Sequence, residues 1–247
     1  MKVIIGVPVT ERGVWRLSRR LAVYARRYGN IALPLPQSLC VRIATGGRDA
    51  LDYALKLLNP SGLRVWGSLL TALRALVLDY PGVEVGCYAS EESYAASEER
   101  GYTIAALTVK ARAYNIVNPE EWLKVFESPP PRTIVGSLAG YNAIVADGYS
   151  WMVKLRREIR PSKLLILDIM APTPLDILDL MASGYLDTSS VREVIDYAVK
   201  YIGEYVVTSR TLTQAYDKLL MDKGYLELLK RLRLKVYKPG RRGESSR

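Results

Sequence analysis

Short apolar runs rich in β-branched residues recur along the first 170 residues and predict β-strands. The run VIIGVPV at residues 3–9 contains no polar side chain, which is typical of a strand buried on both faces of a sheet. Glycine, proline or polar residues that favour turns bound such runs. We therefore expect strands, in chain order, at residues 3–9, 31–35, 41–45, 83–88, 102–110, 132–136 and 163–169.

Segments with apolar residues three and four positions apart predict helices between these strands. The strongest helix start is at Asn118, where a capping residue, a proline and two acidic residues follow one another. The first helix carries apolar residues on one face and arginines on the other. Helices are expected at residues 14–28, 49–58, 68–79, from 90 onward, 119–128, 137–157, 174–182 and 189–232, the last with a break near 208–209.

The alternation of strands and helices predicts an α/β fold with mostly parallel sheets flanked by helices. Parallel strands need a crossover connection, which a helix usually supplies. The expected strands end near residue 170, and the chain beyond them reads as helical. This pattern excludes a simple doubly wound domain and predicts a helical C-terminus.

The composition of the 247-residue chain removes several kinds of chemistry. It contains no histidine, so a histidine base, a histidine-activated nucleophile and a histidine metal ligand are excluded. Cys40 and Cys87 cannot by themselves form a cysteine-only zinc site. We expect both cysteines to be reduced and buried, with a disulfide as the alternative. Glycine-rich dinucleotide and Walker motifs are missing, so no cofactor and no metal are expected.

Positive charge is concentrated at the C-terminal end of the chain. Residues 223–247 hold nine basic and two acidic residues, a net charge of +7 out of the total of +10. Residues 233–247 are therefore expected to form a basic, flexible tail, which could bind nucleic acid or an anionic membrane. Because residues 1–222 carry a net charge of only +3, nucleic acid is the least favoured partner.

Targeting signals are not evident in the sequence. The first apolar run is too short for a signal peptide, and no cysteine near the start could carry a lipid. No apolar run reaches the roughly 18 residues of a membrane span. We therefore expect a cytoplasmic location without a membrane span. Two glutamines among many charged residues are typical of a thermophile's protein.

Candidate ligand-binding residues follow the predicted strands, because ligands of open α/β sheets bind at the carboxyl ends of strands. Backbone N–H groups at a helix start attract anions, and arginine matches a carboxylate or a phosphate. The alternative for each residue is structural: a helix cap, a tight turn or a solvated side chain. The candidates are Thr10, Arg12, Thr45, Gly46, Arg48, Ser137 and Tyr141.

Asp168 is a further candidate because it interrupts an apolar strand at residues 165–169. A carboxyl group buried in a ligand site with a raised pKa could act as the acid–base group of an enzyme. The alternative is an aspartate that only forms structural hydrogen bonds.

The order of these motifs resembles the type II periplasmic-binding-protein-like, or solute-binding-protein-like, superfamily. Its chains open with a strand like residues 3–9 and continue with a strand–turn–helix similar to VRIATGGRDA at residues 41–50. The strand–Gly–Ser turn at residues 132–137 looks like the start of their second lobe. Residues 163–169 and 174–187 look like its end. The chain resembles in particular a small archaeal family of unknown function related to solute-binding lipoproteins.

The resemblance implies a two-lobed fold with a cleft that holds a small anionic ligand. It implies a cytosolic ligand-binding protein with no assigned catalysis, since the expected leader or lipid anchor of transport members is missing. The alternative is an enzyme of the same fold, such as a lyase or dehydratase acting on a small organic acid, as in menaquinone-pathway relatives. The expected division is lobe 1 at residues 1–103, lobe 2 at 104–186, a helical return to lobe 1 at 187–232 and the tail at 233–247.

Overall fold

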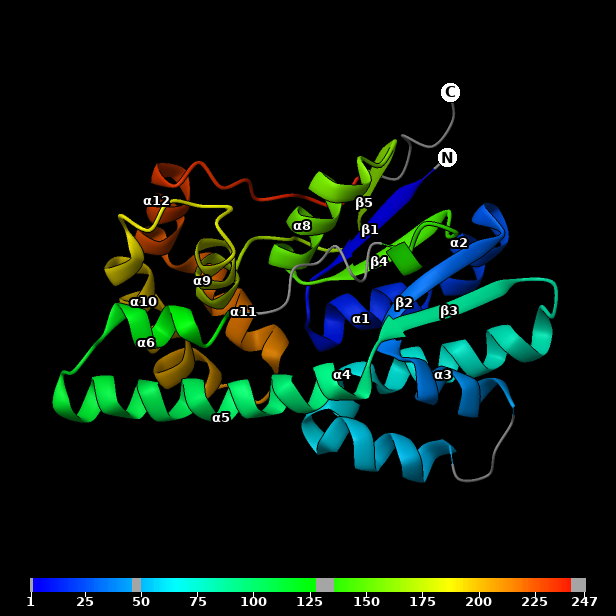
Figure 1. Ribbon diagram of the computed structural model, residues 1–247, viewed down its shortest axis with the longest axis horizontal. Coiled ribbons are helices and arrows are strands. Elements are labelled where there is room, and N and C mark those ends of the chain that lie inside the picture. Colours follow the sequence, from blue (N-terminus) through cyan, green and yellow to red (C-terminus); the bar gives the residue numbers. More distant parts are fainter. Residues whose placement is uncertain (1, 46–49, 128–135, 241–247) are drawn as a thin grey trace. The chain divides into compact units, whose positions relative to one another are not determined.

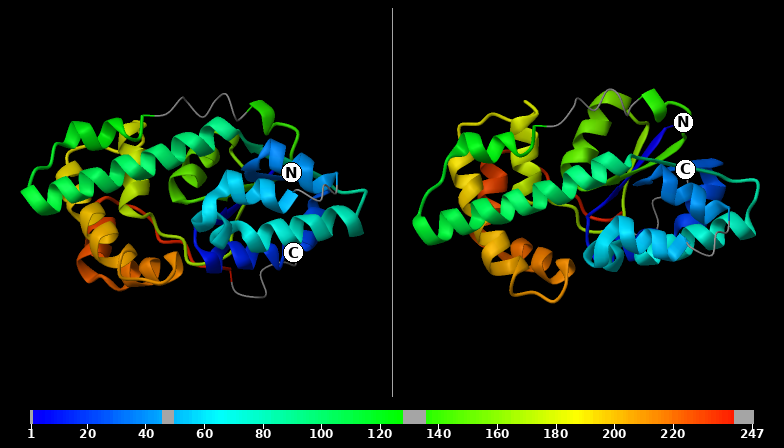
Figure 2. Two further views of the ribbon diagram at one scale, coloured as in Figure 1. Left: turned by 90° about the horizontal axis from the view of Figure 1, so that it is seen from below. Right: turned by 60° about the horizontal axis from the view of Figure 1, so that its bottom comes forward.

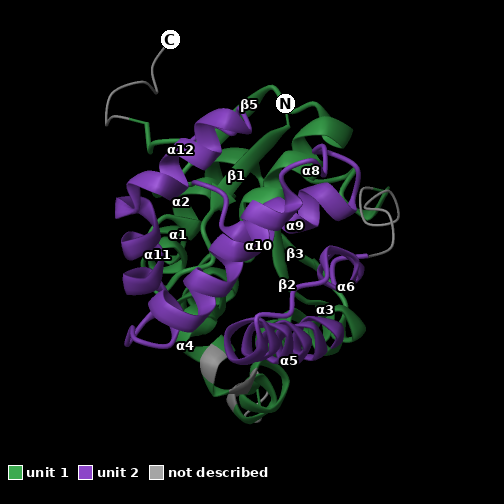
Figure 3. Ribbon diagram, turned by 90° about the vertical axis from the view of Figure 1, so that its left-hand side faces the viewer, with its two compact units in different colours: residues 1–95, 131–170, 237–247 green, residues 96–130, 171–236 purple. Residues whose placement is uncertain are grey.

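The computed structural model describes residues 2–45, 50–127 and 136–240 (Figure 1). The chain forms two compact units, and each unit is assembled from separate stretches of sequence (Figure 3). Unit 1 consists of Met1–Ala95, Pro131–Met170 and Tyr237–Arg247, and unit 2 consists of Ala96–Pro130 and Ala171–Val236.

A five-stranded sheet forms the centre of unit 1. Its strands pair in parallel, in the order β3–β2–β4–β1–β5. This confirms the expected α/β fold with parallel strands and flanking helices. Strand β1, which lies between β4 and β5, is buried at every position, as its apolar sequence predicts. The strands are β1 (Val3–Val7), β2 (Asn30–Pro36), β3 (Glu84–Ala89), β4 (Ala143–Asp147) and β5 (Lys163–Ile166).

Helices cover both sides of this sheet. Helix α8 packs on β1 and β4, while α2 contacts β2, and α3 contacts β2 and β3. Helix α4 packs in turn against α1, α2 and α3. In Figure 1, α8 lies above the strands, and α1 and α4 lie below them. The bounds of these helices are α1 (Glu11–Ser18), α2 (Leu21–Tyr28), α3 (Gln37–Ala44), α4 (Ala50–Asp79) and α8 (Tyr149–Ile159).

The described residues of unit 2 form helices around a separate apolar core (Figure 2). Trp122 and Tyr225 are among its largest fully buried side chains. The Tyr216 hydroxyl accepts from the Ala171 N–H and donates to the Ala171 carbonyl oxygen, which fixes the chain where it enters this unit. The helices are the second part of α5 (Glu91–Tyr114), α6 (Pro119–Lys124), α9 (Pro174–Ala182), α10 (Val191–Lys200), the π-helix η1 (Tyr201–Val206), α11 (Leu212–Met221) and α12 (Lys223–Arg231).

Two predicted strands are wrong, because both segments are helical. Residues 41–45 fall in the end of α3, where Leu39 and Ile43 are buried four positions apart. Residues 102–110 fall inside α5, where Ile104 and Thr108 are buried with the same spacing. The β-branched residues of both segments favour a strand locally, but burial of one helical face overrides that preference.

The predicted helix at residues 137–157 is also wrong, because it hides a strand. Residues 143–147 form β4 at the centre of the sheet, and α8 starts only at Tyr149. Gly148 makes this sharp change of direction with φ +86°, a conformation that favours glycine. The predicted loop at residues 59–62 is wrong in the opposite sense, since α4 continues through Pro60. Residues 132–135 of another predicted strand lie outside the described residues.

The two units group the chain differently from the predicted lobes. The described part of residues 131–170, expected in lobe 2, contributes β4 and β5 to the sheet that contains β1. Residues 187–232, expected to return to lobe 1, belong to unit 2. The expected flexible tail is fixed at Tyr237, because its N–H and carbonyl groups both bond to Met170 at 2.9 Å. Residues 241–247 lie outside the described residues.

Candidate functional site

The connections of the sheet reverse direction between β2 and β4, which are neighbours at its centre. After β2 the chain continues to β3 on one side, whereas after β4 it continues to β5 on the other side. In open parallel sheets, ligands bind at the carboxyl ends of the strands at such a reversal, because the two connections leave a crevice there. The carboxyl ends of β2 and β4 are therefore the first place to look for a site.

Strands β2 and β4 pair only over a short stretch. Ile31 pairs with Ala143 and Ala32 with Ile144, and the pairing stops there although both strands continue. The cause lies in the sequence LPLP at residues 33–36, since Pro34 and Pro36 have no N–H to donate to a neighbouring strand. The prolines thus open the centre of the sheet toward its carboxyl edge.

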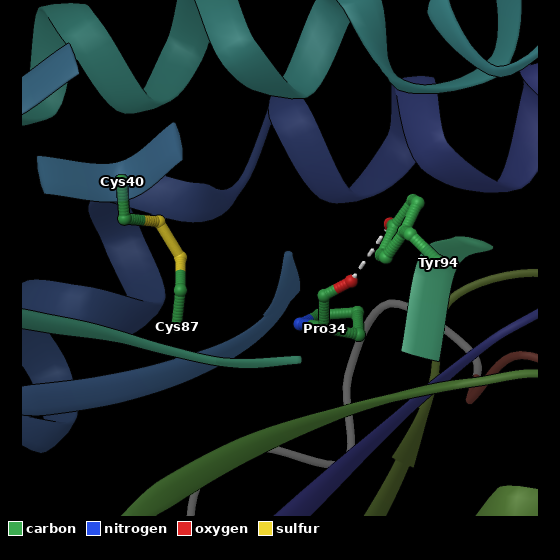
Figure 4. The surroundings of a disulfide bond; sticks show 4 residues. All are labelled: Pro34, Cys40, Cys87 and Tyr94. Atoms are coloured by element: carbon green, nitrogen blue, oxygen red, sulfur yellow. Dashed lines mark hydrogen bonds between the residues drawn. A yellow bond between two sulfur atoms is a disulfide. The ribbon is translucent and has the colours of Figure 1, made fainter. Parts of the chain in front are cut away.

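Two tyrosines bond to the carbonyl groups of the parting strands. The Tyr88 hydroxyl, from β3, donates to the Val145 carbonyl oxygen at 2.6 Å. The Tyr94 hydroxyl, from α5, donates to the Pro34 carbonyl oxygen at 3.2 Å (Figure 4). The Tyr88 hydroxyl also accepts from Trp151 Nε1 at 2.9 Å, and the two rings lie 6.3 Å apart. These bonds satisfy backbone acceptors that the interrupted strand pairing does not.

Asp147 adds a carboxylate to this aromatic group at the end of β4. Its side chain is partly exposed, and its negative charge raises the pKa of both tyrosines. Burial raises the pKa of the Tyr88 phenol well above its usual value and Asp147 raises it further, whereas the hydrogen bond from Trp151 lowers it. Burial and then Asp147 also raise the pKa of Tyr94. Both phenols therefore stay protonated at neutral pH and act as hydrogen-bond donors.

We name Tyr88, Tyr94, Asp147 and Trp151 the tyrosine–aspartate cluster. None of the four was a candidate in the sequence. Asp147 and Trp151 fall in the helix predicted at residues 137–157, which hid the end of β4, and Tyr88 and Tyr94 carry no local signal of a site. Two signals could have revealed the cluster: the prolines within the apolar run at 31–36, and the Asp–Gly pair that follows the apolar residues 143–146.

Thr10, Arg12 and Asp168 lie at the same carboxyl edge, beyond β1 and β5. The Thr10 hydroxyl accepts from the Gly13 N–H at 3.1 Å, so it caps α1 and is buried. Arg12 Nε donates to one Asp168 oxygen at 2.7 Å, and Arg16 Nη1 donates to the other at 2.9 Å. The Ile169 N–H donates to that second oxygen as well, at 2.8 Å.

The pairing of Arg12 with Asp168 unites two residues that were proposed for different roles. Arg12 was expected to bind an anionic ligand, and Asp168 to serve as a ligand contact or a catalytic acid. Asp168 is buried, with 3% of its side chain exposed, and both of its oxygens bond to guanidinium groups. Asp168 therefore forms structural hydrogen bonds, which was the alternative to a ligand or catalytic role. The guanidinium group of Arg12 is bonded to Asp168 in the same arrangement.

The remaining candidates do not join these residues. Thr45 ends α3, and its exposed hydroxyl donates to the Val41 carbonyl oxygen. Ser137 is exposed. Tyr141 precedes β4 and so lies at the amino edge of the sheet, opposite the edge that carries Thr10; its ring packs on Gly86 of β3. Gly46 and Arg48 lie outside the described residues.

Cys40 and Cys87 form a disulfide, which Figure 4 shows together with Pro34 and Tyr94. It joins α3, which follows β2, to β3 at the residue before Tyr88, with a Cα–Cα distance of 6.2 Å. The expectation of reduced cysteines is wrong, and the alternative of a disulfide holds. The bond therefore links two elements that both contact β2.

Unit 2 has a pocket of its own, with a volume of about 420 Å³, lined by α5, η1 and Val207. Its lining is aliphatic apart from Thr108 and Arg112. Arg112 Nη1 donates to the Gly203 carbonyl oxygen at 2.5 Å, and a Cβ at Gly203 would collide with the Arg112 guanidinium. π-Helical turns are common at functional sites, but this lining carries no carboxylate for acid–base chemistry.

The described residues contain no cluster of acidic or cysteine side chains that could hold a metal ion. Within the same part of the chain, no helix has the length and apolar character needed to cross a membrane. No protein-family model, curated protein or solved structure matches the chain, so the resemblance to periplasmic-binding-protein-like chains stays a prediction.

Proposed function

We propose that unit 1 binds a small molecule at the carboxyl edge of its sheet, where β2 and β4 part. One observation carries the proposal: the strand pairing ends at Ala32 and Ile144, and the tyrosine–aspartate cluster occupies the edge beyond. Sheet reversals of this kind are where open α/β folds bind their ligands.

The chemistry of the cluster favours a ligand with a flat apolar surface and a cationic or hydrogen-bond-donating nitrogen. The rings of Tyr88 and Trp151 offer stacking surface, and Asp147 offers a carboxylate. The anionic ligand expected from Arg12 is less well supported, because Arg12 and Arg16 bond to Asp168.

A thermal-shift screen with small heteroaromatic amines, nucleosides and organic acids tests the proposal. A ligand at 100 times its Kd stabilises the folded protein by about 2.7 kcal/mol. We expect an amine or nucleoside to give such a shift, and Asp147→Asn to remove it. Asp79→Asn, a change at an exposed carboxylate of the same unit, should leave it intact.

Two results would contradict the proposal. One is a screen in which only organic acids bind. The other is a shift that survives both Asp147→Asn and Trp151→Leu, since the ligand would then lie elsewhere.

The type II periplasmic-binding-protein-like fold, the cytoplasmic location and the thermophilic, archaeal character all stay predictions. A binding function at the β2–β4 edge does not depend on any of them. It requires only the sheet and the cluster of unit 1.

A further inference from the structure

Four exposed arginines lie close together in the sequence at the junction of α1 and α2 and along α2. The segment from residue 11 to residue 28 contains six arginines and a single acidic residue, Glu11. We name the exposed four the arginine face: Arg19, Arg20, Arg26 and Arg27.

Each arginine of this face has an aromatic partner. Arg19 lies over the Trp15 ring at 5.7 Å, Arg26 over Tyr80 at 5.2 Å and Arg27 over Tyr28 at 5.8 Å. Arg20 Nη1 donates to the Tyr24 hydroxyl at 3.4 Å. An aromatic contact orders a guanidinium without neutralising its charge, so these groups remain available to an anion.

Other arginines of the same helices are neutralised by an ion pair. Arg12 and Arg16, on α1, both bond to the buried Asp168. No carboxylate among the described residues forms an ion pair with any of the four arginines of the arginine face. Within the described part of the chain, the positive charge of these four side chains is therefore not neutralised by a direct ion pair.

The exposure of Trp15 indicates what kind of polyanion the surface suits. Trp15 is 53% exposed, although tryptophan is usually well buried. Arginines that bind phosphates beside an aromatic ring that stacks on bases are typical of surfaces for single-stranded nucleic acid.

A membrane surface fits these helices less well. An interfacial helix inserts a broad apolar face into the lipid. The apolar residues Val14, Leu17, Leu21 and Ala25 of α1 and α2 are instead at most 1% exposed, because they pack in the core of unit 1.

We propose that the arginine face and Trp15 bind single-stranded nucleic acid, with the guanidinium groups on phosphates and the indole stacked on a base. The small net charge of residues 1–222 conceals this surface, because acidic residues elsewhere offset a local excess of arginine. The proposal is independent of the ligand site at the β2–β4 edge.

The experiment measures the affinity of the full-length protein for fluorescent single-stranded RNA and DNA of about 20 nucleotides, in KCl from about 50 to about 200 mM. Each phosphate contact on a single strand contributes a slope of about −0.7 to log K against log salt. Four contacts predict a contribution of about −3, which is about a 50-fold loss of affinity across this range.

The fourfold variant Arg19→Gln, Arg20→Gln, Arg26→Gln and Arg27→Gln should bind at least about 50-fold more weakly at the lowest salt and lose that part of the slope. Trp15→Ala should weaken binding about tenfold and leave the slope unchanged. Should the fourfold variant not fold, single Arg19→Gln and Arg27→Gln variants test the same point, each with a loss of about fivefold and a smaller slope.

A matched control removes the same charge from the C-terminal basic segment. Lys223, Lys230, Lys235 and Lys238 are exposed, and replacing all four with glutamine should change affinity less than about threefold. An equal loss in this control would assign binding to that segment and overturn the proposal. It is also overturned if neither oligonucleotide binds or if the fourfold arginine variant binds like the parent.

Discussion

The carboxyl edge of the sheet has two halves that use their polar residues in opposite ways. Beyond β1 and β5, Asp168 is buried and bonded to Arg12 and Arg16. Beyond β2 and β4, Asp147 is partly exposed beside Tyr88 and Tyr94, whose hydroxyls bond to backbone carbonyl groups. Both halves place an aspartate at or just after a strand end, so the position in the fold does not explain the difference.

Strand pairing and the neighbouring charges explain it. β1 pairs along its length with β4 and over four residues with β5, and the arginines of α1 close over the strand ends. β2 has two prolines, its pairing with β4 stops early, and the Tyr88 and Tyr94 hydroxyls bond to carbonyl groups of the two strands. The comparison teaches that an aspartate following an apolar strand can be fully engaged in ion pairs, whereas prolines in an interior strand can end its pairing with a neighbour and leave polar groups at the strand ends.

The largest expected effect on stability concerns the disulfide bond that joins α3 to β3, next to β2. The disulfide between Cys40 and Cys87 closes a loop with a sequence separation of 47 residues. Loop-closure entropy predicts that Cys40→Ala lowers the free energy of unfolding by about 4 kcal/mol. Urea unfolding of the parent and the variant measures this, and a reductant should destabilise the parent but not Cys40→Ala. If the urea midpoint of the parent is the same with and without reductant, the prediction is contradicted.

Removing the ion pairs of Asp168, beyond β1 and β5, should lower the free energy of unfolding somewhat less. Asp168→Asn removes the charge that faces Arg12 and Arg16, whose side chains are 30% and 38% exposed. Because these arginines keep part of their hydration, we expect a loss of about 2–3 kcal/mol in urea unfolding, below that of a fully buried pair. As a control, Asp196→Asn removes an exposed partner 3.8 Å from Arg192 and should cost less than about 0.5 kcal/mol. Equal losses would mean that the two sites do not differ.

Removing a tyrosine hydroxyl at the ends of β2 and β4 should have a smaller effect on the free energy of unfolding. Tyr88→Phe leaves the Val145 carbonyl and the Trp151 indole without this partner, so we expect a loss of about 1–2 kcal/mol. Tyr94→Phe removes one longer hydrogen bond and should cost about 1 kcal/mol. Tyr102→Phe, at an exposed residue, is the control and should be near neutral in the same denaturant titration. A neutral Tyr88→Phe would show that its hydroxyl does not support the parted strands.

The smallest expected effect is a change in how folding stability depends on pH above pH 10. Burial, followed by the Asp147 carboxylate, raises the pKa of Tyr88 and Tyr94 above the usual 10.0. Above pH 10 these phenols lose their protons in the unfolded chain but keep them in the folded one, so their contribution to stability falls as pH rises. The stability of the Tyr88→Phe, Tyr94→Phe double variant should therefore fall less steeply above pH 10 than that of the parent. Parallel pH profiles would contradict this.

The sequence revealed parts of the fold and few residues of the candidate site. The prolines of β2 are visible in it, but their consequence depends on β4 being the neighbouring strand. Arg12 and Asp168 were both singled out, yet 156 positions separate them and nothing local indicates that they pair. Tyr88 and Tyr94 come together with Asp147 only because β3, α5 and β4 meet at one edge.

What the sequence determined by itself is local. The buried strand β1, the Asn118 cap and the helix that starts at Pro174 all depend on residues within a few positions of each other. Tertiary structure decided the helical state of residues 102–110, the order of the strands and the Cys40–Cys87 bond. The physical reason is that local propensities differ by about 1 kcal/mol or less per residue. Burial of a side chain against distant parts of the chain contributes more, about 1.5–3 kcal/mol, and therefore prevails.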